Sequence, residues 1–356
     1  MFRRRAGQAR RLNGLDVRDV LLAVTILSLC TPALAQDTVL VASGSEGGRT
    51  RITGRILDYT GRELTLEHAG GQQRRIPAEL VLNVETPYGQ KHTEADALFA
   101  AGHFDQALPQ YLEARELEDT PQRRWVRRQI IARIVRCYAA LGRPDQAGEA
   151  FLLLVRADPA MLHFDCIPLA WMPRQPSPAM EQTARRWLQR NEPAAALLGA
   201  SHLLAGNARA GALSTLRQLS TSTDRRVALL ASAQTWRAEL TTADDDRLDT
   251  WAQVIEQLPE PLTAGPYFVL GRARAHRKQW DRAALASSRV AILHPQQRPL
   301  AAQSLVDAGR CLEELGDLKG AVRLYRELAR DYPEQRRAVA EAQSRIDALS
   351  EEPKED

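Results

Sequence analysis

The sequence predicts a mainly α-helical protein, in which a solenoid of stacked helix pairs follows a small all-β barrel domain. Between residues 37 and 87 hydrophobic residues alternate with polar ones, which is typical of strands; after residue 88 they recur with helical spacing almost to the C-terminus. Alanine and leucine dominate the composition, whereas aromatic residues make up only 5% of the 356 residues. This composition favours helices that approach one another closely.

The net positive charge is concentrated in the first residues of the chain. The formal charge is +4 at pH 7, and residues 1–19 alone, with six arginines and two aspartates, account for +4. Because the remaining residues sum to zero, the charge does not indicate nucleic-acid binding. The contents of 44% hydrophobic and 26% charged residues are ordinary for a globular protein, which excludes the disordered, collagen-like and disulfide-framework classes.

Residues 1–35 have the layout of an export signal. An arginine-rich stretch precedes the apolar run Val20–Cys30, and residues 33–35 (Ala-Leu-Ala) form a small-residue cleavage site before Gln36. We therefore expect an exported protein of the periplasm, the cell envelope or the exterior. The apolar run is shorter than the roughly 20 residues that a spanning helix needs, so membrane contact through an uncleaved signal is the alternative.

The strand-like region is divided by turns that contain glycine, which supplies the positive φ that tight hairpins need. Four alternating segments are clear: Ile52–Ile56, Glu63–Glu67, Ile76–Pro77 and Leu80–Val84. Because so small a sheet must curl to bury one face, we expect a barrel over residues 37–87. The run resembles the bent five-stranded barrels of the Sm-like and SH3-like type. Sm-like proteins bind RNA, but we expect no nucleic-acid partner for an exported chain.

A helical motif recurs through the rest of the chain. Gly102–Ala107 (Gly-His-Phe-Asp-Gln-Ala) returns 40 residues later as Gly142–Ala147 (Gly-Arg-Pro-Asp-Gln-Ala), and glycine, alanine and proline keep this frame after residue 264. The pattern resembles the tetratricopeptide repeat, a helix-turn-helix unit of about 34 residues. The frames that match well are 88–121, 128–161, 264–297 and 302–335, and two degenerate ones cover 192–225 and 228–262.

The resemblance implies both packing and function. Small residues at the eighth and twentieth repeat positions would let two helices cross closely, an aromatic residue at the twenty-fourth would fill the space between them, and a proline near the thirty-second would end the second helix. The first helices of the repeats would line a concave groove for a protein or peptide partner. The residues that the resemblance places in the groove are Arg136, Trp236, Phe268, Arg272, His276 and Arg310.

Arginine is the notable residue type in this predicted groove. A guanidinium group suits a carboxylate because it offers paired donors. The alternative is that these arginines bridge to acidic residues of neighbouring helices, with Glu313 and Glu314 as candidates. The family's lysine-and-asparagine clamp for C-terminal carboxylates is not matched, so capture of a peptide terminus does not follow from the resemblance.

The repeat frame breaks between residues 162 and 191. Ala160–Pro176 is too apolar for a solvated linker and too rich in proline for a helix, and Ser177-Pro178 then starts a helix. We interpret the segment as filling a gap between two sub-arrays; the alternative is that it folds back over the groove. Residues 336–356 are predicted to form a capping helix, with a disordered tail from Ser350.

The sequence offers little catalytic or metal-binding chemistry. Gly44–Thr50 lacks the spacing and the lysine of a phosphate-binding loop. His163, Asp165 and Cys166 are metal-ligand residue types, but no second ligand pair accompanies them. We therefore expect no metal, no cofactor and no enzyme activity, but a scaffold. The alternatives are an envelope assembly factor whose barrel binds an envelope component, and an enzyme with its site under the 160–177 loop.

Three cysteines remain once the export signal is removed. Cys137 and Cys311 lie in apolar helical patterns, where they are expected to be small buried hydrophobic residues. Because three is an odd number, at least one cysteine has no partner within the chain.

Overall fold

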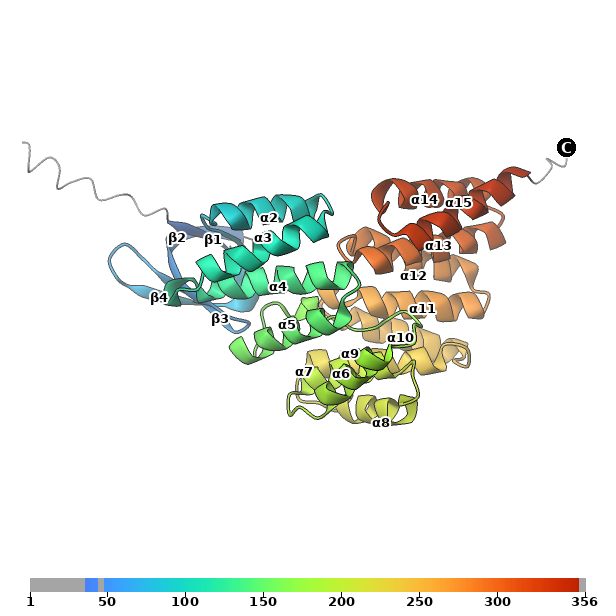
Figure 1. Ribbon diagram of the computed structural model, residues 1–356, viewed down its shortest axis with the longest axis horizontal. Coiled ribbons are helices and arrows are strands. Elements are labelled where there is room, and N and C mark those ends of the chain that lie inside the picture. The colour runs from blue at the N-terminus through green and yellow to red at the C-terminus, as the bar shows by residue number, and fades with distance from the viewer. Residues whose placement is uncertain (1–35, 44–47, 352–356) are drawn as a thin grey trace, which may run out of the picture. The chain divides into compact units, whose positions relative to one another are not determined.

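The computed structural model describes residues 36–43 and 48–351, which form two units (Figure 1). The predicted export signal and the centre of the first predicted hairpin turn, residues 44–47, lie outside the described residues. One unit is a β-sheet of residues 36–57 and 63–88, and the other is helical and consists of residues 58–62 and 89–351. The predicted class, mainly α with an all-β N-terminal domain, is confirmed.

The sheet has five antiparallel strands in the order β4-β3-β2-β1-β5, so the first and last strands lie side by side. The strands are β1 (Asp37–Ser43), β2 (Gly48–Tyr59), β3 (Glu63–Glu67), β4 (Gln73–Pro77) and β5 (Val81–Glu85). Alternate residues of β1 to β3 are buried, as period-two spacing requires, and β4 buries Ile76 alone. The pairing leaves β4 and β5 at the edges, so closure of the sheet into a barrel stays a prediction.

The described part of the chain continues with fourteen α-helices, and none of them is both long and apolar enough to cross a membrane. Consecutive helices pack most closely within the runs α2–α5, α6–α9 and α10–α15. The helices are α2 (Gln90–Ala100), α3 (Phe104–Leu117), α4 (Arg124–Ala140), α5 (Pro144–Ala157), α6 (Pro178–Leu188), α7 (Pro193–Leu203), α8 (Arg209–Leu219), α9 (Arg225–Glu239), α10 (Asp245–Glu256), α11 (Ala264–His276), α12 (Trp280–Leu293), α13 (Arg298–Glu314), α14 (Leu318–Asp331) and α15 (Arg336–Glu351).

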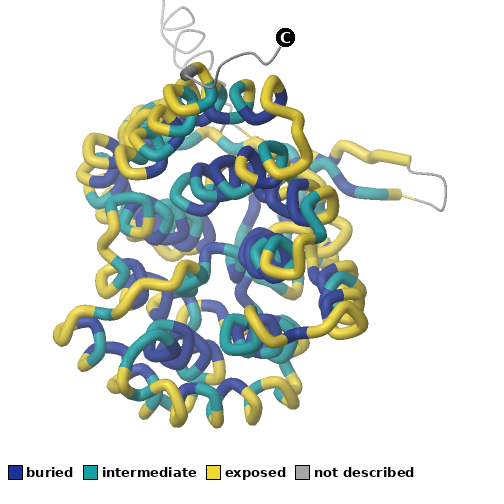
Figure 2. Tube along the Cα trace, turned by 90° about the vertical axis from the view of Figure 1, so that its right-hand side faces the viewer, coloured by how far each residue is buried: buried dark blue, intermediate teal, exposed yellow. Residues whose placement is uncertain are grey.

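Small and aromatic residues at the predicted repeat positions form the contacts within each helix pair. The alanines at the twentieth position and the aromatic residues at the twenty-fourth are all fully buried: Ala107, Ala147, Ala283, Ala321, Tyr111, Phe151 and Tyr325. Figure 2 shows the buried stretches of the helices turned toward their neighbours. Close helix approach therefore depends on the absence of side-chain bulk at the crossing points.

Prolines end the second helices where the pattern expects them. Helices α5, α12 and α14 each stop two residues before a proline, at Pro159, Pro295 and Pro333 respectively. A proline restricts the residue before it to extended conformations, which terminates the helix.

The middle of the array departs from the predicted frame. Helix α7 packs against α6 more extensively than against α8, and a Cβ atom on Gly199 would lie 2.5 Å from the carbonyl oxygen of Ala184 in α6. The helix inserted before residue 191 therefore takes part in the stack. At the other end, α15 extends to Glu351, so Ser350 is helical, contrary to the predicted start of the disordered tail.

Two glycines in helices provide a matched test of this packing. A Cβ atom on Gly309 would lie 2.4 Å from the Tyr325 ring, whereas nothing lies within 4 Å of one on Gly211. We expect Gly309→Ala to lower the free energy of unfolding by about 1–3 kcal/mol. Gly211→Ala should raise it by up to about 1 kcal/mol, because alanine is the better helix former. Urea denaturation of both variants checks this, and equal effects would contradict the packing described.

Candidate functional site

The segment between α5 and α6, residues 160–177, lies against the first helices of the repeats. We call it the connecting segment. It contacts α4, α7, α9 and α11, which are helices that the repeat pattern expects to line the groove. These contacts are compatible with both interpretations of the sequence, a segment that fills a gap between two sub-arrays and one that folds back over the groove.

The connecting segment begins at a tight bend held by a buried carboxylate. Asp158 accepts hydrogen bonds from the backbone N–H groups of Leu162 (3.1 Å) and Gly61 (2.9 Å). Met161, which lies between Asp158 and Leu162 in the chain, has φ 43°. This value is in the left-handed region, which a residue such as methionine rarely adopts. The surrounding hydrogen bonds hold this strained conformation.

Arg226 at the start of α9 fastens the first part of the connecting segment. Its guanidinium group donates to the carbonyl oxygens of Ala160 (2.8 Å) and Met161 (3.0 Å) and lies 4.4 Å from the centre of the Phe164 ring. The same side chain pairs with Asp224, which caps α9. One arginine thus satisfies two backbone carbonyls and stacks on an aromatic ring.

Of the three metal-ligand residue types in the connecting segment, Asp165 holds the segment in place, and His163 and Cys166 are uncharged at pH 7. Asp165 forms an ion pair with Arg136 of α4 at 2.5 Å. Burial, followed by the charge of Arg136, lowers the pKa of His163 to about 4, so its imidazole is neutral at pH 7. Burial raises the pKa of the Cys166 thiol to about 12. No group of three His, Cys, Asp or Glu side chains that could hold a metal ion occurs among the described residues.

Helices α7 and α9 hold the second part of the connecting segment through its backbone. The N–H group of Ala170 donates to the Ser201 hydroxyl (3.2 Å), and its carbonyl accepts from the Gln234 amide (3.3 Å). Nε2 of His202 donates to the Pro168 carbonyl (3.0 Å), because a carbonyl oxygen can only accept. Burial lowers the pKa of this histidine to about 4, so the ring is neutral at pH 7. Hydrogen bonds to the backbone N–H and carbonyl groups, as formed here, are the contacts by which an extended peptide is bound.

The indole of Trp171 lies directly on α11 at a glycine. A Cβ atom on Gly265 would be 1.9 Å from Cε2 of Trp171, so only glycine permits this contact. The indole also packs against the buried cluster that contains Phe268 and the stacked rings of Trp236 and Trp251. Trp171 is therefore the anchor of the connecting segment.

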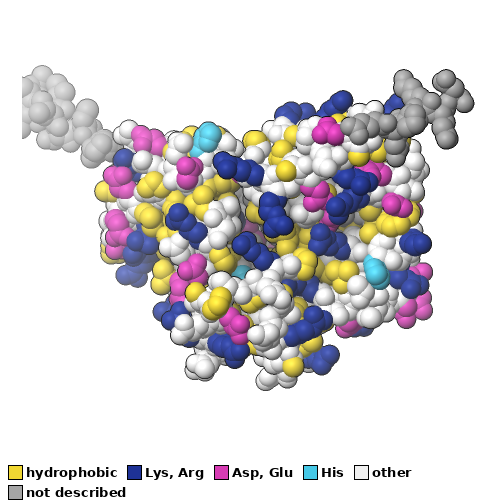
Figure 3. Space-filling model, turned by 45° about the vertical axis from the view of Figure 1, so that its right-hand side comes forward, with side chains coloured by type: hydrophobic (Ala, Val, Ile, Leu, Met, Phe, Trp, Pro, Cys, Tyr) yellow, Lys and Arg dark blue, Asp and Glu magenta, His cyan; other side chains and the backbone are white. Residues whose placement is uncertain are grey.

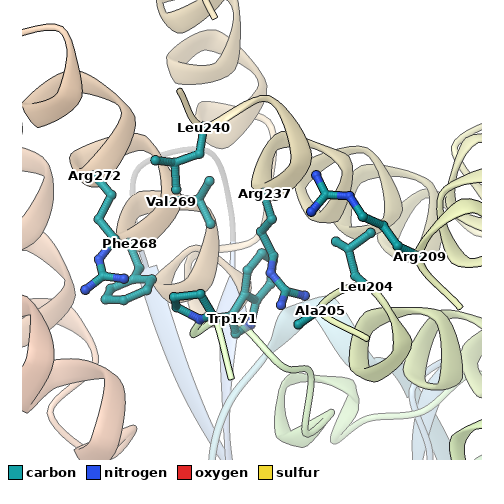
Figure 4. Close-up of a pocket in the computed structure, with 10 residues that line it drawn as sticks. Trp171, Leu204, Ala205, Arg209, Arg237, Leu240, Phe268, Val269 and Arg272 are labelled. Atoms are coloured by element: carbon teal, nitrogen blue, oxygen red, sulfur yellow. The ribbon is translucent and has the colours of Figure 1, made fainter. Parts of the chain in front are cut away.

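A cleft of about 440 Å³, including its open mouth, lies beside Trp171 (Figure 4). Three arginines from three different helices, Arg209, Arg237 and Arg272, reach it. Its other walls are mainly apolar and are formed by Trp171, Pro173, Leu204, Leu240, Phe268 and Val269.

The four predicted arginine and histidine groove residues lie at four separate places. Arg136 holds the connecting segment, and Arg272 forms an ion pair with Asp307 at 2.7 Å. Arg310 is half-exposed and pairs with Glu341 at 2.5 Å, and His276 is exposed at the end of α11. The predicted alternative, bridging to acidic residues elsewhere, thus describes the arginines, although Glu313 and Glu314 are not the partners.

The two predicted aromatic groove residues are both buried. Trp236 is stacked on Trp251 with ring centres 4.9 Å apart, and it offers no groove surface. Phe268 lines the cleft, and the guanidinium group of Arg272 lies 4.6 Å from its ring centre. The structure therefore brings Phe268 and Arg272 together in one site and leaves the other predicted residues outside it.

Sequence reasoning missed the cleft residues Arg209, Arg237 and Trp171. Arg237 follows Trp236 directly, so a frame shifted by one residue in this degenerate repeat would have selected it. Trp171 belongs to no repeat, and its only signal was the apolar character of Ala160–Pro176.

A comparison with protein families bears on the repeat pattern. Residues 303–334 match the family model of the tetratricopeptide repeat. The match covers α14 and most of α13, and together with the helix pairs that precede it supports a tetratricopeptide-repeat protein. Among curated proteins none matches the chain.

Replacing Gly265 should release the anchor of the connecting segment. In Gly265→Ala the new methyl group would overlap the Trp171 indole, so we expect trypsin to cleave faster after the exposed Arg174. Limited proteolysis with mass spectrometry measures the rate. Gly211→Ala is the matched control and should cleave like the wild type; an unchanged rate in Gly265→Ala would show that Trp171 does not anchor the segment.

Acid should destabilise the contacts of the connecting segment. Burial lowers the pKa of His163 and His202 to about 4, below the value of about 6.5 in an unfolded chain. The stability that depends on their neutral forms is present above pH 6.5 and is lost as the pH falls toward 4, by on the order of 1–3 kcal/mol for each imidazole.

The pH dependence of urea unfolding between pH 7 and 4.5 tests this expectation. His202→Gln should flatten the dependence, whereas replacement of the exposed His276 by Gln should leave it unchanged. Parallel curves for wild type and His202→Gln would contradict the assignment.

Proposed function

We propose that the protein is an exported, non-catalytic scaffold that binds a protein or peptide segment on the surface formed by the first helices of its repeats. One observation carries the proposal: this surface already holds an extended segment of the chain itself. Side chains of α4, α7 and α9 bind the backbone and side chains of the connecting segment, and α11 receives its tryptophan. A partner segment would be held by the same kinds of contact.

The surface beyond the connecting segment offers room for such a partner. Along α13 the side chains of Gln303, Asp307, Arg310 and Glu314 follow one another at helical spacing and are at least partly exposed. Figure 3 shows basic and hydrophobic side chains intermingled over the helical unit. Mixed polar and apolar surfaces of this kind are ordinary for interfaces that form and dissociate.

The absence of catalytic activity is part of the proposal. The groups that suggested an enzyme site under the connecting segment are engaged elsewhere: Asp165 pairs with Arg136, and Cys166 is buried as a neutral thiol. Cys137 and Cys311 are likewise free and buried, and burial raises their thiol pKa values to about 12 and about 11. Such thiols are poor nucleophiles.

Two arginine variants test where a partner binds. Mature 36–356 would be used to capture proteins from an extracytoplasmic fraction, and the affinity of the captured protein would then be measured. We expect Arg310→Glu on α13 to weaken it about tenfold, because a charge on the contact surface is reversed.

The matched control is Arg326→Glu on α14, an exposed residue of a second helix that forms no ion pair within the described chain. It should leave the affinity unchanged. Equal affinities for both variants and wild type would mean that the partner does not bind to the first helices. Failure to capture any protein would count against a scaffold.

A further inference from the structure

Among the described residues, two of the three arginines in the cleft have no acidic partner. Arg237 of α9 donates from Nη1 to the Ser201 carbonyl (2.8 Å) and to the Gln234 side chain (2.7 Å), and Arg209 of α8 makes one long hydrogen bond, 3.4 Å, to the Ala238 carbonyl. These acceptors are uncharged. Within the described ranges neither guanidinium group forms an ion pair, so two positive charges share the cleft unbalanced.

Two other partly buried guanidinium groups of the helical unit are neutralised by carboxylates. Arg272, at the opposite end of the cleft, pairs with Asp307, and Arg136 under the connecting segment pairs with Asp165. A buried charge without a counter-charge costs stability, which is why such pairing is the rule. Arg237 departs from this rule, and the charge that acts on it is that of another cation, Arg209.

Burial of its unbalanced charge lowers the pKa of Arg237. Burial, and secondly repulsion from Arg209, lowers the pKa of its guanidinium group to about 10, so the group still carries its charge at pH 7. An anion placed between the two guanidinium groups would balance their charges. It would thereby offset both the cost of burying the charge of Arg237 and the repulsion from Arg209. Figure 4 shows Arg237 ending beside Trp171 and Ala205, and Arg209 extending toward the same space from α8.

The walls of the cleft restrict what kind of anion can enter. Trp171, Leu240 and Phe268 present apolar surface beside the guanidinium groups. Such walls disfavour an inorganic anion, because on entering the cleft it would lose its water and gain no donors for its remaining lone pairs. They favour a carboxylate that is attached to an apolar group.

We propose that the cleft binds a carboxylate of a partner peptide between Arg209 and Arg237, with a neighbouring large apolar side chain of that peptide against Trp171 and Leu240. The inference rests on the proposed function and names the chemistry of its partner. The carboxylate belongs either to the peptide's C-terminus or to an aspartate or glutamate side chain. Paired arginine donors suit both.

Two random peptide libraries distinguish these sources. One carries free C-terminal carboxylates and the other C-terminal amides, and each is selected on mature 36–356. If the terminal carboxylate is bound, only the first library should be enriched, with large apolar residues at the last position. If a side chain is bound, both libraries should converge on an acidic residue beside an apolar one.

Arginine substitutions then test the site with one selected peptide. We expect Arg237→Gln and Arg209→Gln each to weaken binding about 10- to 100-fold, as loss of a charge-assisted hydrogen bond does. Arg217→Gln, which removes an exposed arginine from the same helix as Arg209, should bind like the wild type. Arg209 is itself exposed, so its variant should fold even if the Arg237 variant does not.

Thermal unfolding without peptide separates binding from structure. Because Arg237→Gln removes an unbalanced buried charge, its melting temperature should equal or exceed that of the wild type. A clearly lower melting temperature would mean that the hydrogen bonds of Arg237 to Ser201 and Gln234 outweigh the cost of its charge, and the binding of Arg209→Gln would then decide the proposal.

The outcomes also separate this inference from the proposed function. Enrichment of peptides without a carboxylate preference, or binding that survives both arginine variants, would overturn the proposed carboxylate site. The proposed scaffold function would not be affected. If a folded wild-type protein selects no peptide from either library but captures a protein from the extracytoplasmic fraction, the cleft proposal fails and the scaffold stands. If it captures neither, both proposals fail.

Discussion

The attachment of the connecting segment to the first helices is the interaction on which the arrangement of the helical unit depends. Helices α5 and α6 meet where Trp187 packs on Gly148 and donates to Glu149, and the two halves of the array are joined there and through residues 160–177. Arg226 and Arg136 hold the beginning of this segment, and Trp171 on Gly265 holds its end. Without these contacts an apolar segment and several backbone carbonyls would face water or lie unpaired.

The same attachment links the fold to the proposed activity. A surface that satisfies the backbone of one extended segment, through Ser201 and Gln234, has the donors and acceptors that a second peptide needs. The cleft beside Trp171 then combines repeat residues with a residue from outside the repeats. Specificity in such a scaffold would come from the inserted segment as much as from the helices.

The sequence allowed the helix pairs to be predicted because their packing is local and periodic. Alanines such as Ala283 and aromatic residues such as Tyr325 recur at fixed spacing, and each is buried against the preceding helix of its pair. The path of the connecting segment has no period. It is set by residues far along the chain, such as Arg226, which lies 66 residues beyond Ala160, and the choice between Trp236 and Arg237 depended on a single residue of register.

Hydrogen exchange on residues 36–356, with and without a bound partner or selected peptide, tests the central claim most directly. The account predicts added protection in α9, α11 and α13 and in residues 160–177, because the partner lies on the first helices beside the connecting segment. Protection confined to the five-stranded sheet, or to the second helices α12 and α14, would contradict it.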